Sequence, residues 1–173
     1  MKKIFFGFIL GVIAVFGGGY LFLISGLMPV ATIAPALPLE EWAAHLAIHA
    51  AMRGETSLAS PLKTSEENLH AGAQVYLQHC AVCHGQPDHK PSMIAKGMFP
   101  KPPQLFEKDD LVTDDPIAKI YWKVKNGIRL TGMPGFQGNL SETEMWQVSQ
   151  VLLEADHLPE PIKSLLSATA PGN

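Results

Sequence analysis

The stretch that decides the fold is Cys80-Ala81-Val82-Cys83-His84. It contains the only two cysteines of the chain, three residues apart, and a histidine follows the second one directly. Two thiols at this spacing can add to the two vinyl groups of a haem, and the adjoining imidazole can then reach the iron from the same side. Cys-x-x-Cys-His is the attachment signature of haem c. We therefore expect Cys80 and Cys83 to hold one haem covalently, with His84 as an axial ligand of its iron.

Other chemistries of a cysteine pair suit this stretch less well. A thioredoxin-like redox pair follows a strand in a βαβ unit, whereas a helical pattern precedes Cys80. A structural zinc site needs four ligands, and the histidines nearby (His70, His79 and His89) are not at a familiar spacing. A plain disulfide would leave His84 unexplained.

Helix-start and helix-stop signals predict three helices in this part of the chain, over residues 66–79, 115–126 and 142–155. Capping boxes precede the first and the third, formed by Thr64 with Glu67 and by Ser141 with Glu144. Asp115-Pro116 gives the middle helix an acidic cap and a proline in its first turn. Because no segment has a convincing strand pattern, the sequence predicts an all-α domain.

The segment from residue 85 to residue 114 has no strong periodic pattern and contains five prolines. A structureless loop of about 30 residues is uncommon in a compact domain unless something organises it. Three short helices would also form only a thin core. A large, planar, apolar cofactor would account for both features.

The second axial ligand is expected to be a methionine, a soft thioether ligand that raises the potential of haem iron. Four methionines follow the motif. Met145 lies on the last predicted helix, where a core or surface role is expected, and Met93 and Met98 follow His84 too closely to reach the opposite haem face easily. Met133 lies between glycine and proline residues in a rigid loop, and it is the expected ligand.

Residues 65–155 resemble a class I cytochrome c domain. The resemblance is carried by Gly72-x-x-x-Tyr76 before the haem motif, by Thr131-Gly132-Met133-Pro134, and by Leu140-Ser141-x-x-Glu144-x-Trp146. It implies an all-α, cytochrome c-like fold around one covalent haem c.

The resemblance also implies particular contacts. Gly72 and Tyr76 are expected to pack against the last helix near Trp146 and Gln150. The segment 102–105 is expected to line the haem, with a backbone carbonyl that accepts the Nδ1–H of the axial histidine. The full set of expected pocket-lining residues is Pro103, Leu105, Trp122, Ile128, Pro134 and Phe136. Tyr121 and Trp122 are expected to pack around the haem rather than to relay electrons.

The N-terminal segment has the composition of a membrane span. Lys2 and Lys3 are the only charged residues among the first 39, and residues 4–27 are almost wholly apolar or glycine. A bilayer is crossed by about 20 such residues. A cleaved signal peptide has a shorter apolar core, and the candidate cleavage site at residues 34–36 lies well beyond this one. We therefore expect an uncleaved, single-pass anchor in a bacterial inner membrane, with the two lysines inside and the haem domain outside.

Four parts of the chain are expected. They are a transmembrane anchor (1–27), an extracytoplasmic linker with a short helix (28–63), a cytochrome c domain (64–158) and a C-terminal tail (159–173). In the short helix, His45 and His49 are four residues apart, but two ligands alone make a poor metal site.

Charge excludes one class of function and leaves another open. The net charge of −3 over 173 residues does not predict a nucleic-acid-binding surface. A cluster of cations, Lys119, Lys123, Lys125 and Arg129, follows five acidic residues between positions 107 and 115. We interpret these charges as a solvated surface, with a docking rim for a redox partner as the alternative.

The expected function is single-electron transfer between respiratory or dehydrogenase partners, through Fe(III)/Fe(II), without catalysis and without a small-molecule substrate. One alternative is a fixed haem c subunit of a larger membrane oxidoreductase complex. A less favoured alternative is a haem sensor or peroxidase, which would need an open iron position. The sequence leaves open the electron donor and acceptor, the potential and the oligomeric state.

Overall fold

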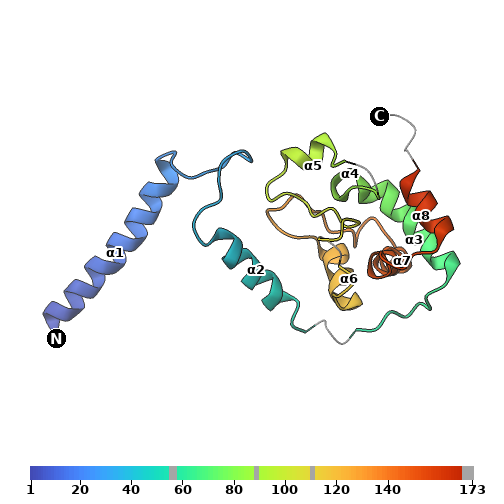
Figure 1. Ribbon diagram of the computed structural model, residues 1–173. Coiled ribbons are helices and arrows are strands. Elements are labelled where there is room, and N and C mark those ends of the chain that lie inside the picture. The colour runs from blue at the N-terminus through green and yellow to red at the C-terminus, as the bar shows by residue number, and fades with distance from the viewer. Residues whose placement is uncertain (55–57, 88–89, 110–111, 169–173) are drawn as a thin grey trace. The chain divides into compact units, whose positions relative to one another are not determined.

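The computed structural model describes residues 1–54, 58–87, 90–109 and 112–168. Within these ranges the backbone is helical apart from loops and one isolated bridge between Ile128 and Met133. This confirms the all-α prediction. The helices (Figure 1) are α1 (Lys2–Ile24), α2 (Glu40–Ala51), α3 (Glu66–His79), α4 (Ala81–His84), α5 (Met93–Gly97), α6 (Ile117–Asn126), α7 (Glu142–Leu153) and α8 (Glu160–Ser167).

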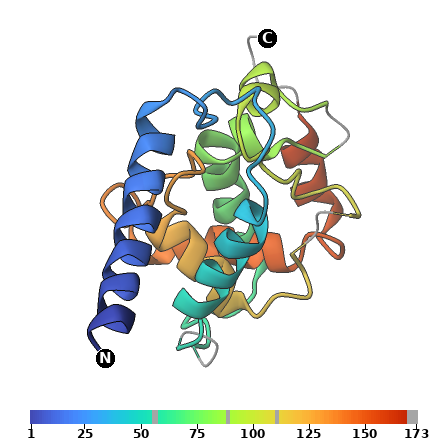
Figure 2. The same ribbon diagram turned by 90° about the vertical axis from the view of Figure 1, so that its left-hand side faces the viewer.

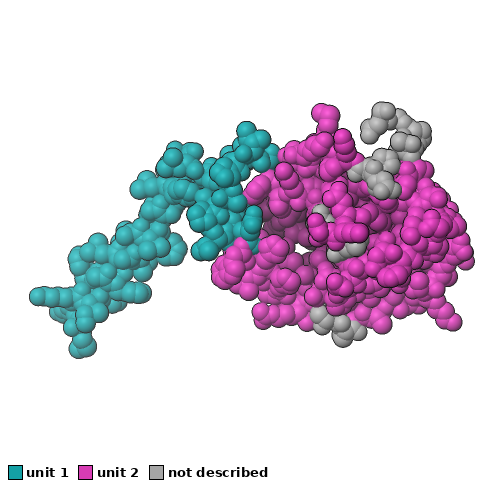
Figure 3. All heavy atoms as spheres, in the orientation of Figure 1, with its two compact units in different colours: residues 1–41 teal, residues 42–173 magenta. Residues whose placement is uncertain are grey.

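The chain divides into two compact units, Met1–Glu41 and Trp42–Asn173 (Figure 3). The first contains α1, a helix of 23 residues with no buried side chain. Among the described residues, α1 is the one helix long and apolar enough to cross a membrane, a property that signal sequences share. The second unit contains the haem motif and the helices that surround it.

The crossing of α3 and α7 forms the centre of the second unit. At Gly72 the two backbones approach so closely that an added Cβ would overlap the carbonyl of Gln147. Gly72 therefore packs against the last helix, as the resemblance implied, and the atoms nearest to its added Cβ belong to Gln147 and Val151. Nearby, the side-chain amide of Gln147 donates to the Asn68 side chain over 2.9 Å.

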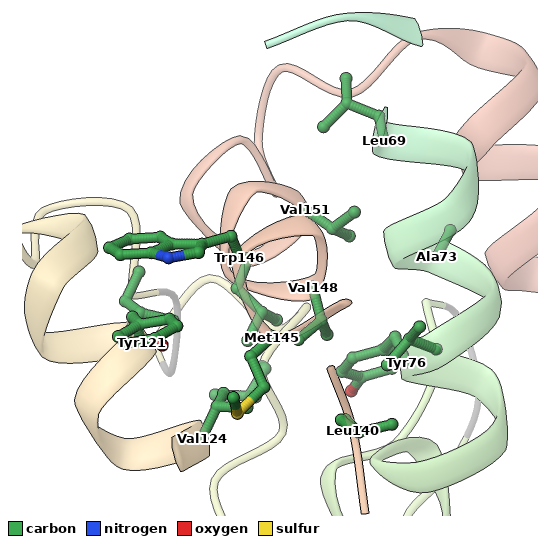
Figure 4. Packing of buried hydrophobic residues seen from close by; sticks show 14 of the residues in the cluster. Leu69, Ala73, Tyr76, Tyr121, Val124, Leu140, Met145, Trp146, Val148 and Val151 are labelled. Atoms are coloured by element: carbon green, nitrogen blue, oxygen red, sulfur yellow. The ribbon is translucent and has the colours of Figure 1, made fainter. Parts of the chain in front are cut away.

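Helix α6 packs on the opposite side of α7 through two stacked aromatic rings. The rings of Tyr121 and Trp146 are 3.8 Å apart between centroids and 9° from parallel (Figure 4). Both side chains are buried, as is Met145 beside them. Tyr121 therefore belongs to the hydrophobic core, as the sequence indicated, and Met145 also has a core role.

Helix α8 corrects one prediction. Residues 159–173 were expected to form a tail outside the domain, yet residues 160–167 are helical. Figure 2 shows this helix in dark red. Ile162 and Leu166 have no exposed surface and belong to the core. They lie four residues apart and so share one helical face, which packs α8 against α3. Residues 169–173 lie outside the described residues.

Two helix starts also differ in detail from the prediction. Ser65, and not Thr64, caps α3, since its side chain accepts the backbone N–H of Asn68. Asp115 does not cap α6 but accepts from Nζ of Lys123 over 3.0 Å. The capping box of α7 has the predicted geometry, with both hydrogen bonds formed.

The α3–α7 crossing predicts the effect of adding one methyl group. Gly72→Ala should lower the free energy of unfolding by about 1–3 kcal/mol, because overpacking forces two helix backbones apart. Denaturant unfolding of the haem-loaded protein, followed by circular dichroism, measures this. Gly138→Ala is the matched control, since no atom lies within 4 Å of its added Cβ. Equal stability of the two variants would contradict the close crossing.

Candidate haem site

The haem motif is wound into one helical turn at the end of α3. The backbone N–H of Cys80 donates to Tyr76 over 2.8 Å, and that of His84 donates to Cys80 over 2.9 Å. Residues at positions i, i+3 and i+4 share one face of a helix. The turn therefore presents both thiols and the imidazole on the same side of the backbone.

Tyr76 fastens the end of this turn to α3. Its hydroxyl donates to the carbonyl of Gly85 over 2.8 Å. Burial raises the pKa of Tyr76 far above its usual range, so the phenol stays protonated and remains a donor. Gly85 has φ 75°, a left-handed conformation that glycine adopts without strain. The chain can thus leave the motif sharply, directly behind His84.

The segment Pro103–Leu105 binds the motif from the other side through three hydrogen bonds. The His84 ring nitrogen Nδ1 lies 2.9 Å from the Pro103 carbonyl. The backbone N–H of Leu105 donates to the carbonyl of His84 over 3.2 Å. The Gln104 side-chain amide donates to the carbonyl of Cys83 over 3.1 Å.

The first of these bonds fixes the form of the imidazole. A carbonyl oxygen only accepts, so the proton of His84 resides on Nδ1 and the lone pair on Nε2 is left for a metal. Burial lowers the pKa of His84, and its hydrogen bond to Pro103 opposes that shift more weakly. The neutral ring is the form that ligates iron. The hydrogen bond implied by the resemblance is present in the structure.

The two thiols suit haem attachment better than the alternatives. Cys80 and Cys83 are not joined in a disulfide. Burial, helped by neighbouring Cys83, raises the pKa of the Cys80 thiol to about 12, whereas redox-active cysteines have lowered values. Within the described ranges, no three His, Cys, Asp or Glu side chains lie together so that they could hold a metal ion. His45 and His49 are among these described residues and belong to no such group of three.

The loop that carries Met133 is a closed turn. The backbone N–H of Ile128 donates to the Met133 carbonyl over 3.1 Å. Inside the turn, the Thr131 hydroxyl donates to Ile128 over 2.7 Å and accepts the N–H of Met133 over 3.2 Å. Gly132 has φ 79°, and Leu130 has φ 65°, which is strained for a residue with a side chain. The turn thus fixes the backbone of Met133 on both sides.

Close backbone approach holds this loop against the end of α6. A Cβ at Gly135 would lie 2.7 Å from the carbonyl oxygen of Asn126. After the loop, the N–H of Phe136 donates to Val124 over 3.0 Å. On the loop's other side, a Cβ at Gly132 would lie 2.8 Å from the terminal methyl carbon of Met98. Met98 therefore packs against the loop, one residue before Met133.

The predicted pocket-lining residues fall into three groups. Leu105 and Phe136 are buried in the hydrophobic core. Trp122 and Ile128 are half-buried, and Pro103 and Pro134 are exposed. Their contact with haem stays a prediction, apart from the role of Pro103 in binding His84.

Sequence reasoning missed two supporting side chains. The side-chain amide of Gln104 donates a hydrogen bond to the motif, and Gln104 is the one polar residue of the segment 102–105. Met98 supports the Met133 loop, a role that no pattern in the sequence indicates. The segment 85–114, expected to lack regular structure, also contains the short helix α5.

The residues present fit a covalently bound haem. One turn supplies two free thiols and an imidazole whose Nε2 is available, and neighbouring segments fix that turn by hydrogen bonds. The donor set suits neither a redox dithiol nor a zinc ion.

The match to one protein family agrees with this chemistry. The family model "Cytochrome C oxidase, cbb3-type, subunit III" matches residues 67–150. No curated protein matches the sequence. Among solved structures, a chain of the reducing HAO-like protein complex of Kuenenia stuttgartiensis is similar, with 23% identity and a TM-score of 0.46. The match covers 58% of this chain and 48% of that one, about half its length. Residues 67–150 therefore form a cytochrome c domain of the cbb3 subunit III type, a family in which a covalent haem transfers electrons.

Proposed function

We propose that this protein is a membrane-anchored, mono-haem c-type cytochrome that transfers single electrons between respiratory or dehydrogenase partners. The observation that carries the proposal is the motif turn with its oriented imidazole. Cys80 and Cys83 would hold the haem by thioether bonds, and Nε2 of His84 would be the first axial ligand. The bound haem supplies one-electron Fe(III)/Fe(II) chemistry.

Met133 is the proposed second axial ligand. Its loop is closed by hydrogen bonds and supported by Met98. The backbone of Met133 would therefore lose little conformational freedom when the side chain binds iron. The rival Met93 is 89% exposed, and Met145 is buried in the α6–α7 core. A thioether ligand raises the potential of the haem iron. Two axial ligands also leave no open iron position, which argues against a peroxidase or a sensor.

Anchoring by α1 is the second part of the proposal. The helix is long and apolar enough to span a bilayer, and Lys2 and Lys3 would stay on the cytoplasmic side. The haem domain would then lie on the outer side of a bacterial inner membrane. Confinement there raises its effective concentration near membrane partners.

A fixed haem c subunit of a larger membrane oxidoreductase complex is the alternative. The matching family model describes an oxidase subunit, and Trp42 and Leu46 on α2 are exposed, as an assembly surface would be. Purification in mild detergent separates the two functions. A stoichiometric complex supports the subunit, and an isolated chain supports the carrier.

The axial assignment predicts the effect of truncating Met133. Met133→Ala should abolish the thioether–iron absorption band of the ferric protein and let carbon monoxide bind the ferrous protein rapidly. The potential should fall on the order of 0.1 V, a fraction of the roughly 0.8 V that axial ligands span. Met93→Ala, which removes an exposed thioether, is the control and should change none of these. A band that persists in Met133→Ala would show that another residue is the ligand.

The anchor predicts where the mature chain is found. Expressed in a bacterium that attaches haem c, the protein should stay in the membrane fraction after a high-salt wash and be released by detergent. Its intact mass should include Met1–Ile24. Leu10→Arg with Ile13→Arg should abolish membrane retention, because each charge in a span is costly. A soluble haem protein that begins beyond residue 36 would show that α1 is a cleaved signal.

A further inference from the structure

The backbone carbonyls at the end of the haem motif accept hydrogen bonds from several different parts of the chain. The last carbonyls of a helix have no partner within that helix, so they depend on donors from elsewhere. For residues 81–85 the donors are the backbone N–H groups of Gly85 and Leu105 and the side chains of Ser92, Gln104 and Tyr76. One of these donors, the Gln104 side chain, also contacts the segment that orients His84.

The carbonyl of Cys83 needs such a donor because of the residue that follows the motif. In an α-helix this carbonyl would accept the backbone N–H four residues further on. That position is Pro87, which has no N–H. Nε2 of Gln104 donates to the Cys83 carbonyl over 3.1 Å instead. A side chain of a distant segment thus supplies the bond that the local chain cannot form.

The same nitrogen of Gln104 holds a second carbonyl. It donates to Pro102 over 3.1 Å, and a primary amide carries two hydrogens, so both bonds can form together. Cys83 directly precedes His84, and Pro102 directly precedes Pro103. The amide therefore bridges the two residues that come just before the partners of the His84–Pro103 hydrogen bond.

The segment around Gln104 is packed much better at one end than at the other. Leu105 is buried in the core, and the ring of Phe106 packs edge-on against Tyr76 with 5.1 Å between centroids. Pro102 and Pro103 lie outside the core cluster of the described residues, and Pro103 is exposed. Because neither proline has an N–H to donate, side-chain donors have to hold this end of the segment.

The His84–Pro103 hydrogen bond is itself close to solvent. It lies in an exposed position, and His84 lines a pocket together with Gln104 and Phe106. Water can therefore compete for the Nδ1–H and for the carbonyl. A hydrogen bond also weakens as its geometry departs from linear. A carbonyl that is held in place gives a stronger and more durable bond than one that moves.

We propose that Gln104 is a positioning residue for the axial histidine, and that its amide holds the Pro103 carbonyl in line with the Nδ1–H of His84. The proposal rests on the proposed function, in which His84 ligates the haem iron. A hydrogen bond at Nδ1 makes an imidazole a more basic ligand and fixes the orientation of its ring. A more basic ligand favours Fe(III), so Gln104 lowers the potential of the haem.

Gln104→Met tests the effect on the potential. Methionine has nearly the length of glutamine but no N–H donor. With the Pro103 carbonyl free to move, the imidazole becomes less basic and the potential should rise. The ratio of ferrous to ferric protein at a fixed applied potential should increase on the order of threefold, which is about 28 mV at 59 mV per tenfold for one electron. Spectroelectrochemical titration of the full-length haem protein in detergent measures this.

Nuclear magnetic resonance of the same samples reports on His84 directly. In the ferrous protein, the Nδ1 proton of His84 should exchange with solvent severalfold faster in Gln104→Met than in the wild type. In the ferric protein, the spread of the haem methyl resonances depends on the plane of the axial imidazole, and it should change. A loss of packing elsewhere in the domain would move neither signal.

Gln150→Met is the matched control. The Gln150 amide, on α7, also donates to two acceptors, Ser60 Oγ over 3.2 Å and the Leu62 carbonyl over 2.9 Å. The same substitution thus removes the same two hydrogen bonds, from an amide that joins other segments. Thermal stability should fall in both variants, whereas the potential and the Nδ1 exchange should change only in Gln104→Met. Equal changes of potential in the two variants would overturn the proposal.

Gln104→Asn covers the case in which Gln104→Met attaches no haem. It keeps the amide on a side chain one methylene shorter, which reduces its reach to the two carbonyls. The potential and the Nδ1 exchange rate should shift in the same direction as in the methionine variant, by a smaller amount. Wild-type values of both in Gln104→Asn, where Gln104→Met does not mature, would count against the positioning role.

The remaining outcomes separate this proposal from the function on which it rests. A fall of the potential in Gln104→Met would show that the amide acts on the haem as a dipole and not through His84, and the proposal would be wrong. An intact haem protein with unchanged potential and exchange would also overturn the role of Gln104, while the carrier function would stand. A wild-type protein that holds no haem c, or that shows no reversible one-electron titration, would overturn the function itself.

Discussion

The imidazole of His84 donates its Nδ1 proton to the Pro103 carbonyl over 2.9 Å, and much of the domain is arranged around that bond. The bond determines which nitrogen can bind iron and in which direction the ring faces. It requires the segment Pro103–Leu105 to lie against the motif, where Leu105 and Gln104 add two further hydrogen bonds. The motif and the segment Pro103–Leu105, about twenty residues apart in sequence, are therefore held together beside His84, the proposed ligand.

The rest of the fold gives this arrangement a rigid base. Tyr76 belongs to the α3–α7 core and also donates to Gly85 at the end of the motif, so the core and the site share one side chain. The close crossing at Gly72 fixes α3, and the motif begins at Cys80, the C-cap of that helix. The Met133 loop is held separately, by the end of α6 and by Met98. Two independent supports thus carry the two proposed axial ligands.

Much of this could be predicted from the sequence, because the informative signals are local. Helix-stop and capping signals placed α3, α6 and α7 within a few residues, and the spacing of Cys80, Cys83 and His84 predicted the chemistry of the site. What could not be predicted depends on tertiary contacts. Ile162, Leu165 and Leu166 of α8 have helical spacing, but so short a pattern does not show that the helix packs on the domain. Asp115 was predicted to be a cap because it directly precedes Pro116, whereas its side chain pairs with Lys123, eight residues further along the chain. The strain at Leu130 is a property of the folded loop alone.

The partial burial of the Cys80 thiol bears on when a haem could be attached. Cys80 packs against the hydrophobic core, and burial raises the pKa of its thiol to about 12. The thiolate is the reactive form of a cysteine, and little of it is present near neutral pH when the pKa is that high. A haem would therefore be attached more readily before the motif turn has packed against the core than afterwards.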